Sequence, residues 1–127
     1  MLQIVFNEIS AAEISNLPTL EQLQIFDEFK VTPDDLANID NPEKQDDRFG
    51  KLTRDDKTLY RFRSGEHRFY FEVIDRKVIV HRILNKGSFS DFLFRTKLPN
   101  PNEDEALADS KHFWNLIEEG RQSRSNL

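Results

Sequence analysis

Three arginines lie close together in the sequence, on either side of the dipeptide Gly65-Glu66. They are Arg61, Arg63 and Arg68. A two-residue hairpin turn with glycine at its first central position is of type II′, and such a turn at Gly65-Glu66 places Arg63 opposite Arg68. Because side chains alternate between the two faces of a strand, all three arginines then share one face. The full register pairs Ser64 with His67, Arg63 with Arg68, Phe62 with Phe69 and Arg61 with Tyr70.

This arginine face, defined by Arg61, Arg63 and Arg68, favours the binding of phosphate. Like charges directly opposed across two strands destabilise a sheet by up to about 1 kcal/mol. A guanidinium group donates two parallel hydrogen bonds to phosphate oxygens, so a bound phosphate backbone would relieve that repulsion. The alternative is that Glu72, or an acidic group from a flanking segment, neutralises the arginines.

The net charge of −5 hides an uneven distribution along the chain. Residues 1–50 carry 11 acidic and 3 basic side chains, residues 51–97 carry 6 acidic and 12 basic, and residues 98–127 carry 6 acidic and 3 basic. A basic middle between two acidic ends is compatible with a site for a polyanion and equally with salt bridges between the segments.

Further side chains near the arginines could take part in the chemistry. The register favours His81 beside Tyr70, where it could transfer protons near neutral pH, although a single histidine on a half-exposed sheet is more often structural. Arg82 and Lys86 border the loop after the last strand-like run, where contacts to phosphate are common. The three histidines are separated in the sequence and no cysteine is present, so we expect no metal and no cofactor.

Length and composition limit the class of protein. A chain of 127 residues forms one ordinary domain, and 11 phenylalanines supply bulky material for its core. No apolar stretch approaches the ~20 residues that cross a bilayer, and the N-terminus lacks the basic segment of a secretory signal. The absence of cysteine agrees with a reducing compartment. We therefore expect a cytoplasmic domain that has no contact with a membrane.

The segment before the arginines is typical of one strand followed by helices. Residues 2–6 favour a short first strand. Capping-box patterns begin at Ser10 and Thr19 and predict two helices. Thr32-Pro33 predicts a short third one, and residues 40–50 a surface loop. The second helix should pack on a sheet through the apolar stripe Leu20, Leu23, Ile25, Phe26 and Phe29.

Three strand-like runs, at residues 58–64, 67–73 and 77–84, predict an antiparallel meander and hence an α+β fold. The apolar pattern favours Phe71 beside Val80. One face of the meander should form the core, with Tyr60, Phe62, Phe69, Phe71, Val73, Val78 and Val80. The other should hold the three arginines with Tyr70, Glu72, Ile79, His81 and Ile83.

Two helices are expected after the meander. Ser88 is a candidate N-cap for a short helix that includes Phe94, and Asn102 for a longer one that ends near Gly120. The first turn of the longer helix is acidic, with Glu103, Asp104 and Glu105, and its docking stripe is Leu107, Phe113, Trp114 and Ile117. Residues 1–97 and an acidic helical extension at residues 98–127 would form one domain, with a loose tail from residue 121.

The order of these elements, and above all the hairpin from Tyr60 to Val73 followed by residues 77–84, resembles the RelE/ParE superfamily of type II toxins. The resemblance covers residues 1 to about 95. It implies a curved antiparallel sheet whose first strand pairs with the meander. In the RelE branch it also implies an endoribonuclease that cuts translated mRNA in the ribosome without a metal and is restrained by a cognate antitoxin.

The resemblance also implies roles for residues of this chain. Arg61 and Arg63 fall where the family places paired basic residues on the first meander strand, and Arg68 matches its phosphate-contacting arginine. In the implied mechanism these groups hold the scissile phosphate, help to activate the 2′-hydroxyl and stabilise the transition state, while a basic group after the last strand, here Lys86, assists the leaving 5′-oxygen. His81 would be an acid or base. Contacts to RNA would come from Tyr70, Arg82 and Phe94.

Several features depart from the family pattern. Phe94 stands where many RelE-type toxins carry a catalytic tyrosine, and a phenyl ring can stack on a base but cannot exchange a proton. Lys86 is the only basic candidate after the last strand. The acidic helix over residues 103–119 could dock over the basic face as an internal damper or extend the core. These departures favour an alternative, a ParE-like or catalytically silent module that binds an antitoxin or DNA gyrase.

Overall fold

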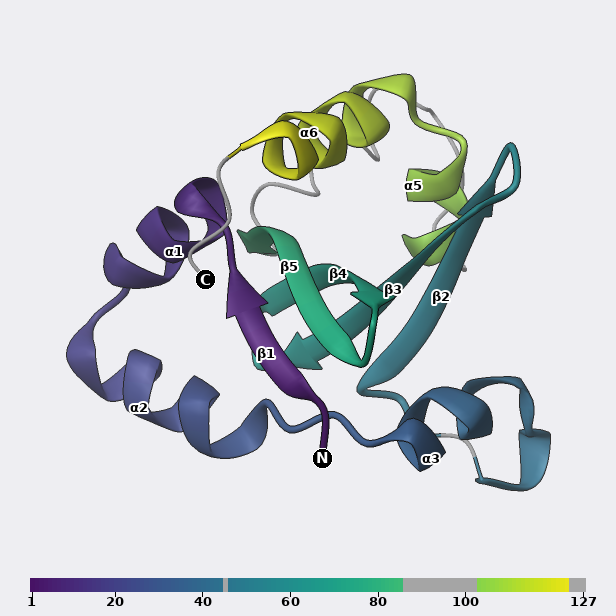
Figure 1. The fold of residues 1–127 in the computed structure, drawn as a ribbon, viewed down its shortest axis with the longest axis horizontal. Coiled ribbons are helices and arrows are strands. Elements are labelled where there is room, and N and C mark those ends of the chain that lie inside the picture. Colours follow the sequence, from purple (N-terminus) through teal and green to yellow (C-terminus); the bar gives the residue numbers. More distant parts are fainter. Residues whose placement is uncertain (45, 86–102, 124–127) are drawn as a thin grey trace.

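In the computed structural model of the protein, which describes residues 1–44, 46–85 and 103–123, helices pack on both faces of a five-stranded sheet (Figure 1). The strand order is β1-β5-β4-β3-β2. The strands are β1 (Gln3–Phe6), β2 (Phe49–Arg54), β3 (Lys57–Ser64), β4 (His67–Ile74) and β5 (Lys77–Asn85). The helices are α1 (Glu8–Ser15), α2 (Thr19–Glu28), α3 (Pro33–Ala37), α5 (Glu103–Ala108) and α6 (Lys111–Gln122), with 3-10 turns at Asn38–Asp40 and Pro42–Lys44. The predicted α+β class is confirmed.

The sheet contains the predicted meander and one strand more. β3, β4 and β5 are the three predicted strands, and β1 pairs with β5 in parallel, with Phe6 opposite Val80. The additional strand is β2, which pairs with β3 through a tight turn at Asp55 and Asp56, both with positive φ angles. The predicted surface loop at residues 40–50 is therefore wrong for Phe49 and Gly50, which belong to β2. β2 contains Gly50 and the charged residues Lys51 and Arg54, so only two of its six residues, Phe49 and Thr53, are of the aromatic or β-branched types that favour strands.

The register of the β3–β4 hairpin is the one predicted from Gly65-Glu66. Arg63 lies opposite Arg68, and Arg61 lies opposite Tyr70. Gly65 has a φ of +58°, which fits the first central position of a type II′ turn. The three arginines therefore share one face of the sheet.

The register between β4 and β5 departs from the prediction at a bulge. Phe71 lies opposite Val80 as predicted, but Tyr70 lies opposite Arg82 instead of His81. His81 is the extra residue between these two pairs. Because one inserted residue reverses the alternation beyond it, Ile83 joins the apolar core and not the arginine face.

The apolar face packs against α1, α2 and α3. Its centre is aromatic, with Phe62 and Phe69 from the sheet in contact with Phe29, which follows α2. The ring of Phe29 stacks on Phe62 with 4.9 Å between centroids and lies 4.8 Å from Phe69. Leu36 and Ile39, which follow the start of α3, pack at the margin of this core.

Only part of the apolar stripe of α2 belongs to this core. Ile25 and Phe29 are buried, whereas Leu20, Leu23 and Phe26 are 81%, 61% and 52% exposed. The expectation that the whole stripe packs on the sheet is therefore wrong. Leu20, Leu23 and Phe26 lie three residues apart and form one row along the helix surface. Ile25 and Phe29 lie four residues apart and form a different row, and only this second row faces the core.

Two helix starts differ from the predicted capping boxes. Asn7 caps α1 by accepting a hydrogen bond from the backbone N–H of Ser10, so α1 begins three residues earlier than the prediction. Pro18 occupies the N-cap of α2 and makes no side-chain cap bond. α3 begins as predicted, with Thr32 as its N-cap and Pro33 in its first turn.

α5 and α6 pack on the face that carries the arginines. They replace the single long helix of the prediction, because Ser110 starts α6 with its own cap, accepting from the N–H of Phe113 at 3.2 Å. The predicted stripe residues Leu107, Phe113 and Ile117 are buried in a second core with Leu52, Leu59, Tyr70 and Leu84. The predicted helix through Phe94 and the predicted cap at Asn102 lie outside the described residues.

Gly120 lies inside α6 and does not end it. A Cβ atom at this position would collide with the backbone carbonyl of His81. Glycine is therefore required here so that α6 can approach β5 closely. None of the helices in the described parts of the chain is long and apolar enough to cross a membrane.

Candidate nucleic-acid interface

The arginine face is closed by α5. Asp104 accepts from Nε of Arg61, at 3.0 Å to Oδ1 and 3.3 Å to Oδ2. Glu103 bridges the other two arginines, with Oε2 3.3 Å from Nη2 of Arg63 and Oε1 3.2 Å from Nε of Arg68. Neutralisation by an acidic flanking segment, which is one of the two alternatives open from the sequence, is therefore what the structure contains.

Backbone carbonyls complete the surroundings of two of the guanidinium groups. Nη1 of Arg61 donates to the carbonyls of Asp47 and Arg48, both at 3.2 Å. Nη1 of Arg68 donates to the carbonyls of Gly65 and His67, at 3.0 and 3.3 Å. Their donors are met within the protein, as buried charge requires.

Arg63 differs from its two neighbours in accessibility. Its side chain is 37% exposed, against 6% for Arg61 and 8% for Arg68. Within the described residues its Nε atom is buried and has no hydrogen-bond acceptor. Arg63 is therefore the arginine that an incoming phosphate could reach first.

Gly50 makes room for the ion pair between Arg61 and Asp104. It lies opposite Arg61 in the register of β2 and β3. A Cβ at Gly50 would collide with the guanidinium group of Arg61 and come within 2.7 Å of Asp104 Oδ2. The glycine thus has a local role that the sequence alone does not reveal.

Tyr70, predicted to contact RNA, lies beneath the two C-terminal helices. It is fully buried, and its ring meets Phe113 edge to face with 4.9 Å between centroids. Burial, followed by the nearby charges of Glu103 and Asp104, holds the pKa of Tyr70 well above its ordinary value. The phenol is therefore protonated at neutral pH, where it can donate a proton in a hydrogen bond but not serve as a base.

His81, the predicted acid or base, is buried beside Glu72 and not beside the arginines. Its Nε2 lies 3.1 Å from Oε1 of Glu72. Burial lowers the pKa of His81 below its ordinary value, although the carboxylate of Glu72 acts in the opposite direction. A neutral imidazole therefore prevails at pH 7.

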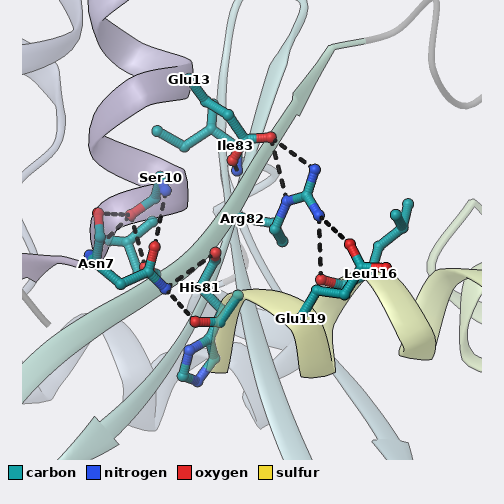
Figure 2. Close-up of polar contacts among 10 residues, drawn as sticks. Asn7, Ser10, Glu13, His81, Arg82, Ile83, Leu116 and Glu119 are labelled. Atoms are coloured by element: carbon teal, nitrogen blue, oxygen red, sulfur yellow. Dashed lines mark hydrogen bonds and ion pairs between the residues drawn. The ribbon is translucent and has the colours of Figure 1, made fainter. Parts of the chain in front are cut away.

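Arg82, predicted to bind RNA, joins α1 to α6 (Figure 2). Its Nε and Nη2 donate to Oε2 of Glu13, at 3.2 and 3.0 Å, and its Nη1 donates to Glu119 and to the carbonyl of Leu116. Oε1 of Glu13 accepts from the backbone N–H of Ile83 at 2.9 Å, and burial raises the pKa of Glu13 despite these donors. These contacts give Arg82 a structural role.

Asn7 makes a second connection between the ends of the chain (Figure 2). Its Nδ2 donates to the carbonyl of Gly120 at 2.7 Å and to that of His81 at 3.2 Å. Ser10 bonds the carbonyl of Val80 at 2.8 Å. The side chains of Asn7 and Ser10, at the start of α1, thus add hydrogen bonds to β5 next to those that β1 makes.

The remaining predicted site residues, Lys86 and Phe94, lie outside the described residues. The sequence predicts the acidic first turn at Glu103 and Asp104 but not which arginine each carboxylate meets. It gives no role to Gly50 or Asn7, and it places Glu13 only in a capping box. Of these, only the acidic run is visible in the sequence as a signal. Within the described residues, no group of three or more histidine, aspartate or glutamate side chains is arranged to hold a metal ion.

Comparisons with known proteins find similarity to solved structures but not to family models. No family model and no curated protein matches it. Its structure is similar to a chain in the crystal structure of the toxin–antitoxin complex RelBE2 from Mycobacterium tuberculosis, at 15% sequence identity and a TM-score of 0.45. The match covers 66% of this chain and 96% of that chain.

Proposed function

We propose that this protein is the toxin of a type II toxin–antitoxin system, and that its arginine face binds the phosphate backbone of RNA as a RelE-type endoribonuclease. The observation that carries the proposal is the convergence of Arg61, Arg63 and Arg68 on one face, with Arg63 directly opposite Arg68. Two carboxylates, those of Glu103 and Asp104, pair with the three guanidinium groups. Within these described ion pairs, three guanidinium groups therefore meet two carboxylates, so their neutralisation by α5 is partial.

The geometry of these ion pairs supports phosphate as the natural ligand. Each carboxylate oxygen that accepts from an arginine occupies a position that a phosphate oxygen could take, because both groups accept from the same guanidinium edge. Arg63, the most exposed of the three, offers the point of entry. In the cleavage that the RelE resemblance implies, the 2′-hydroxyl gives its proton to solvent water as its oxygen attacks phosphorus. The bond from phosphorus to the 5′-oxygen breaks, and the products are a 2′,3′-cyclic phosphate and a 5′-hydroxyl.

Roles in that step are proposed for the arginines from their contacts, and for Lys86 and Phe94 from the resemblance alone. The arginines would stabilise the charge that grows on the phosphate oxygens. Lys86 would protonate the leaving 5′-oxygen, and Phe94 would stack on a base. His81 and Arg82 are bound to Glu72 and to Glu13, contacts that favour structural roles for both.

In vitro translation with purified protein, with the 5′ ends of the mRNA read by primer extension, tests this proposal. Wild type should produce cuts that require ribosomes, and Arg63→Ala should reduce them at least tenfold. Arg76→Asn is the matched control, because Arg76 is an exposed arginine in a turn whose positive φ asparagine tolerates. Cleavage by Arg63→Ala at the wild-type rate would exclude the arginine face as the site.

The exposed stripe on α2 favours a second candidate function, a module that acts by binding a protein without cleavage. Leu20, Leu23 and Phe26 form an apolar patch on one side of a helix, and such patches on a monomer surface mark interaction sites. We propose that this patch contacts the cognate antitoxin in either case. Leu23→Glu should abolish co-purification with a co-expressed antitoxin, whereas Glu43→Lys, an exposed change outside α2, should leave it intact.

A comparison of two variants distinguishes the two candidate functions. An endoribonuclease should lose mRNA cleavage with Arg63→Ala and retain it with Leu23→Glu. A binding module should cut no mRNA at all, and its effect on growth should depend on Leu23 and not on Arg63. In that case DNA gyrase becomes the target to examine by pull-down.

A further inference from the structure

We propose that α5 is a built-in inhibitor of the arginine face, which a bound RNA displaces. This inference rests on the proposed function, because it assumes that the three arginines contact RNA. It adds a mode of regulation: the chain carries its own competitor for the phosphate backbone, and activity requires α5 to leave while α6 stays.

The contacts of α5 are those of a competitor. The carboxylates of Glu103 and Asp104 accept hydrogen bonds from all three guanidinium groups. Glu103 bridges Arg63 and Arg68, and Asp104 pairs with Arg61. RNA would have to exchange phosphate oxygens for these carboxylate oxygens. The exchange preserves the kind of hydrogen bond that each arginine makes, so it does not leave buried charge unpaired.

α5 is attached less extensively than α6. It has six residues, of which Ala106 and Leu107 are buried. α6 has twelve, buries Phe113 and Ile117 and approaches β5 closely at Gly120. α6 is further held by the donors of Arg82 and by the bond from Asn7 to the carbonyl of Gly120.

α6 can also keep its first turn when α5 departs. Its N-cap is Ser110, which belongs to the junction and not to α5, and the hydroxyl of Ser110 satisfies the N–H of Phe113. A helix with its own cap does not need a preceding helix to satisfy its first donors. The junction at Asp109 and Ser110 is therefore the natural point at which α5 separates.

The test compares the affinity of three proteins for a short fluorescein-labelled single-stranded RNA, measured by anisotropy at one fixed ionic strength. Glu103→Gln with Asp104→Asn keeps the side-chain shapes of α5 and removes the two carboxylates that pair with the arginines. Asp27→Asn with Glu43→Gln is the control, since it changes the net charge equally at two exposed carboxylates elsewhere. We expect the α5 variant to bind at least tenfold more tightly than wild type, and the control less than threefold. Equal affinity of the α5 variant and the control would overturn the proposal.

Hydrogen exchange on the wild-type protein provides a second readout that does not depend on how the variant folds. Added RNA should accelerate exchange of the amides in α5 and leave those in α6 unchanged. Protection of α5 by RNA would contradict displacement.

One further variant separates failure of this inference from failure of the proposed function. Arg63→Ala is introduced into the Glu103→Gln, Asp104→Asn background. If wild type and the α5 variant bind RNA equally well and both lose affinity with Arg63→Ala, the RNA site stands and inhibition by α5 is wrong. If the α5 variant binds no RNA, or binds it equally well without Arg63, the proposed function itself is wrong.

Discussion

The two faces of the sheet are covered by helices in two different ways. On the apolar face, Phe62 and Phe69 meet Phe29 through ring contacts that need no particular partner atom. On the opposite face, each arginine is matched by a specific carboxylate of α5. Apolar burial is non-directional, so many helices could cover the first face. Only a helix with acidic residues at the right positions can cover the second, because an unmatched guanidinium group is costly to bury.

The largest loss of stability should follow from a change on the apolar face. Phe62→Ala removes a fully buried ring and leaves a cavity between Phe29 and Phe49. We expect the free energy of unfolding, measured by urea denaturation, to fall by about 3–5 kcal/mol. Phe26→Ala is the control, because Phe26 is half exposed, and it should change stability by less than about 1 kcal/mol. Equal losses would mean that the α2 stripe is buried in solution.

A substitution on the arginine face should lower the free energy of unfolding less, and a second substitution at its partner should restore it. Arg61→Ala leaves the carboxylate of Asp104 without its partner, and we expect a loss of about 2–3 kcal/mol. Replacing both partners, with Arg61→Met and Asp104→Leu, should bring stability back to within about 1 kcal/mol of wild type. A double variant as unstable as the single one would show that the pair is not a self-contained unit.

The close approach of α6 to β5 gives a third and smaller effect. Gly120→Ala pushes a methyl group against the carbonyl of His81, so α6 must shift, at an expected cost of about 1–3 kcal/mol. Asn115→Ala is a suitable contrast, because Asn115 is an exposed residue in the interior of the same helix. Thermal melting should show a clear decrease for the first change and almost none for the second.

The smallest effect should appear as a dependence of stability on pH. Burial lowers the pKa of His81 in the folded protein, where Glu72, Glu118 and Arg121 also act on it. The unfolded chain then binds a proton below about pH 6.5 that the folded protein resists, so stability present above that pH is lost as the pH falls. His81→Gln should show less of this loss between pH 7.5 and 5.5 in urea titrations. A variant with the same pH dependence as wild type would assign the titration to another group.

The predictability of the two faces also differs. The register of the β3–β4 hairpin follows from Gly65-Glu66 and strict alternation, both of which are local signals. The bulge at His81 has no such signal, so the sequence misassigned Ile83 and the partner of Tyr70. β2 was missed for the same reason, since its residues become a strand only by pairing with β3.

Apolar periodicity by itself does not distinguish a core from a docking surface. The α2 stripe has the composition of a buried face, yet Leu20 and Leu23 point to solvent because the sheet offers no further surface there. Likewise, the acidic run at Glu103 is visible in the sequence, but its pairing with residues 35 to 43 positions earlier depends on the fold. Long-range pairing of charges is the part of this site that required the structure.

During synthesis on the ribosome, the three arginines are made well before the α5 carboxylates that pair with them. Arg61 is synthesised 43 residues before Asp104, and Arg68 is synthesised 35 residues before Glu103. At roughly 5–20 residues per second, this leaves an interval of roughly 2–9 s for every new molecule. During that interval the nascent chain lacks the two carboxylates that pair with the three guanidinium groups in the folded protein, and β1 cannot join the sheet before β5 has been made.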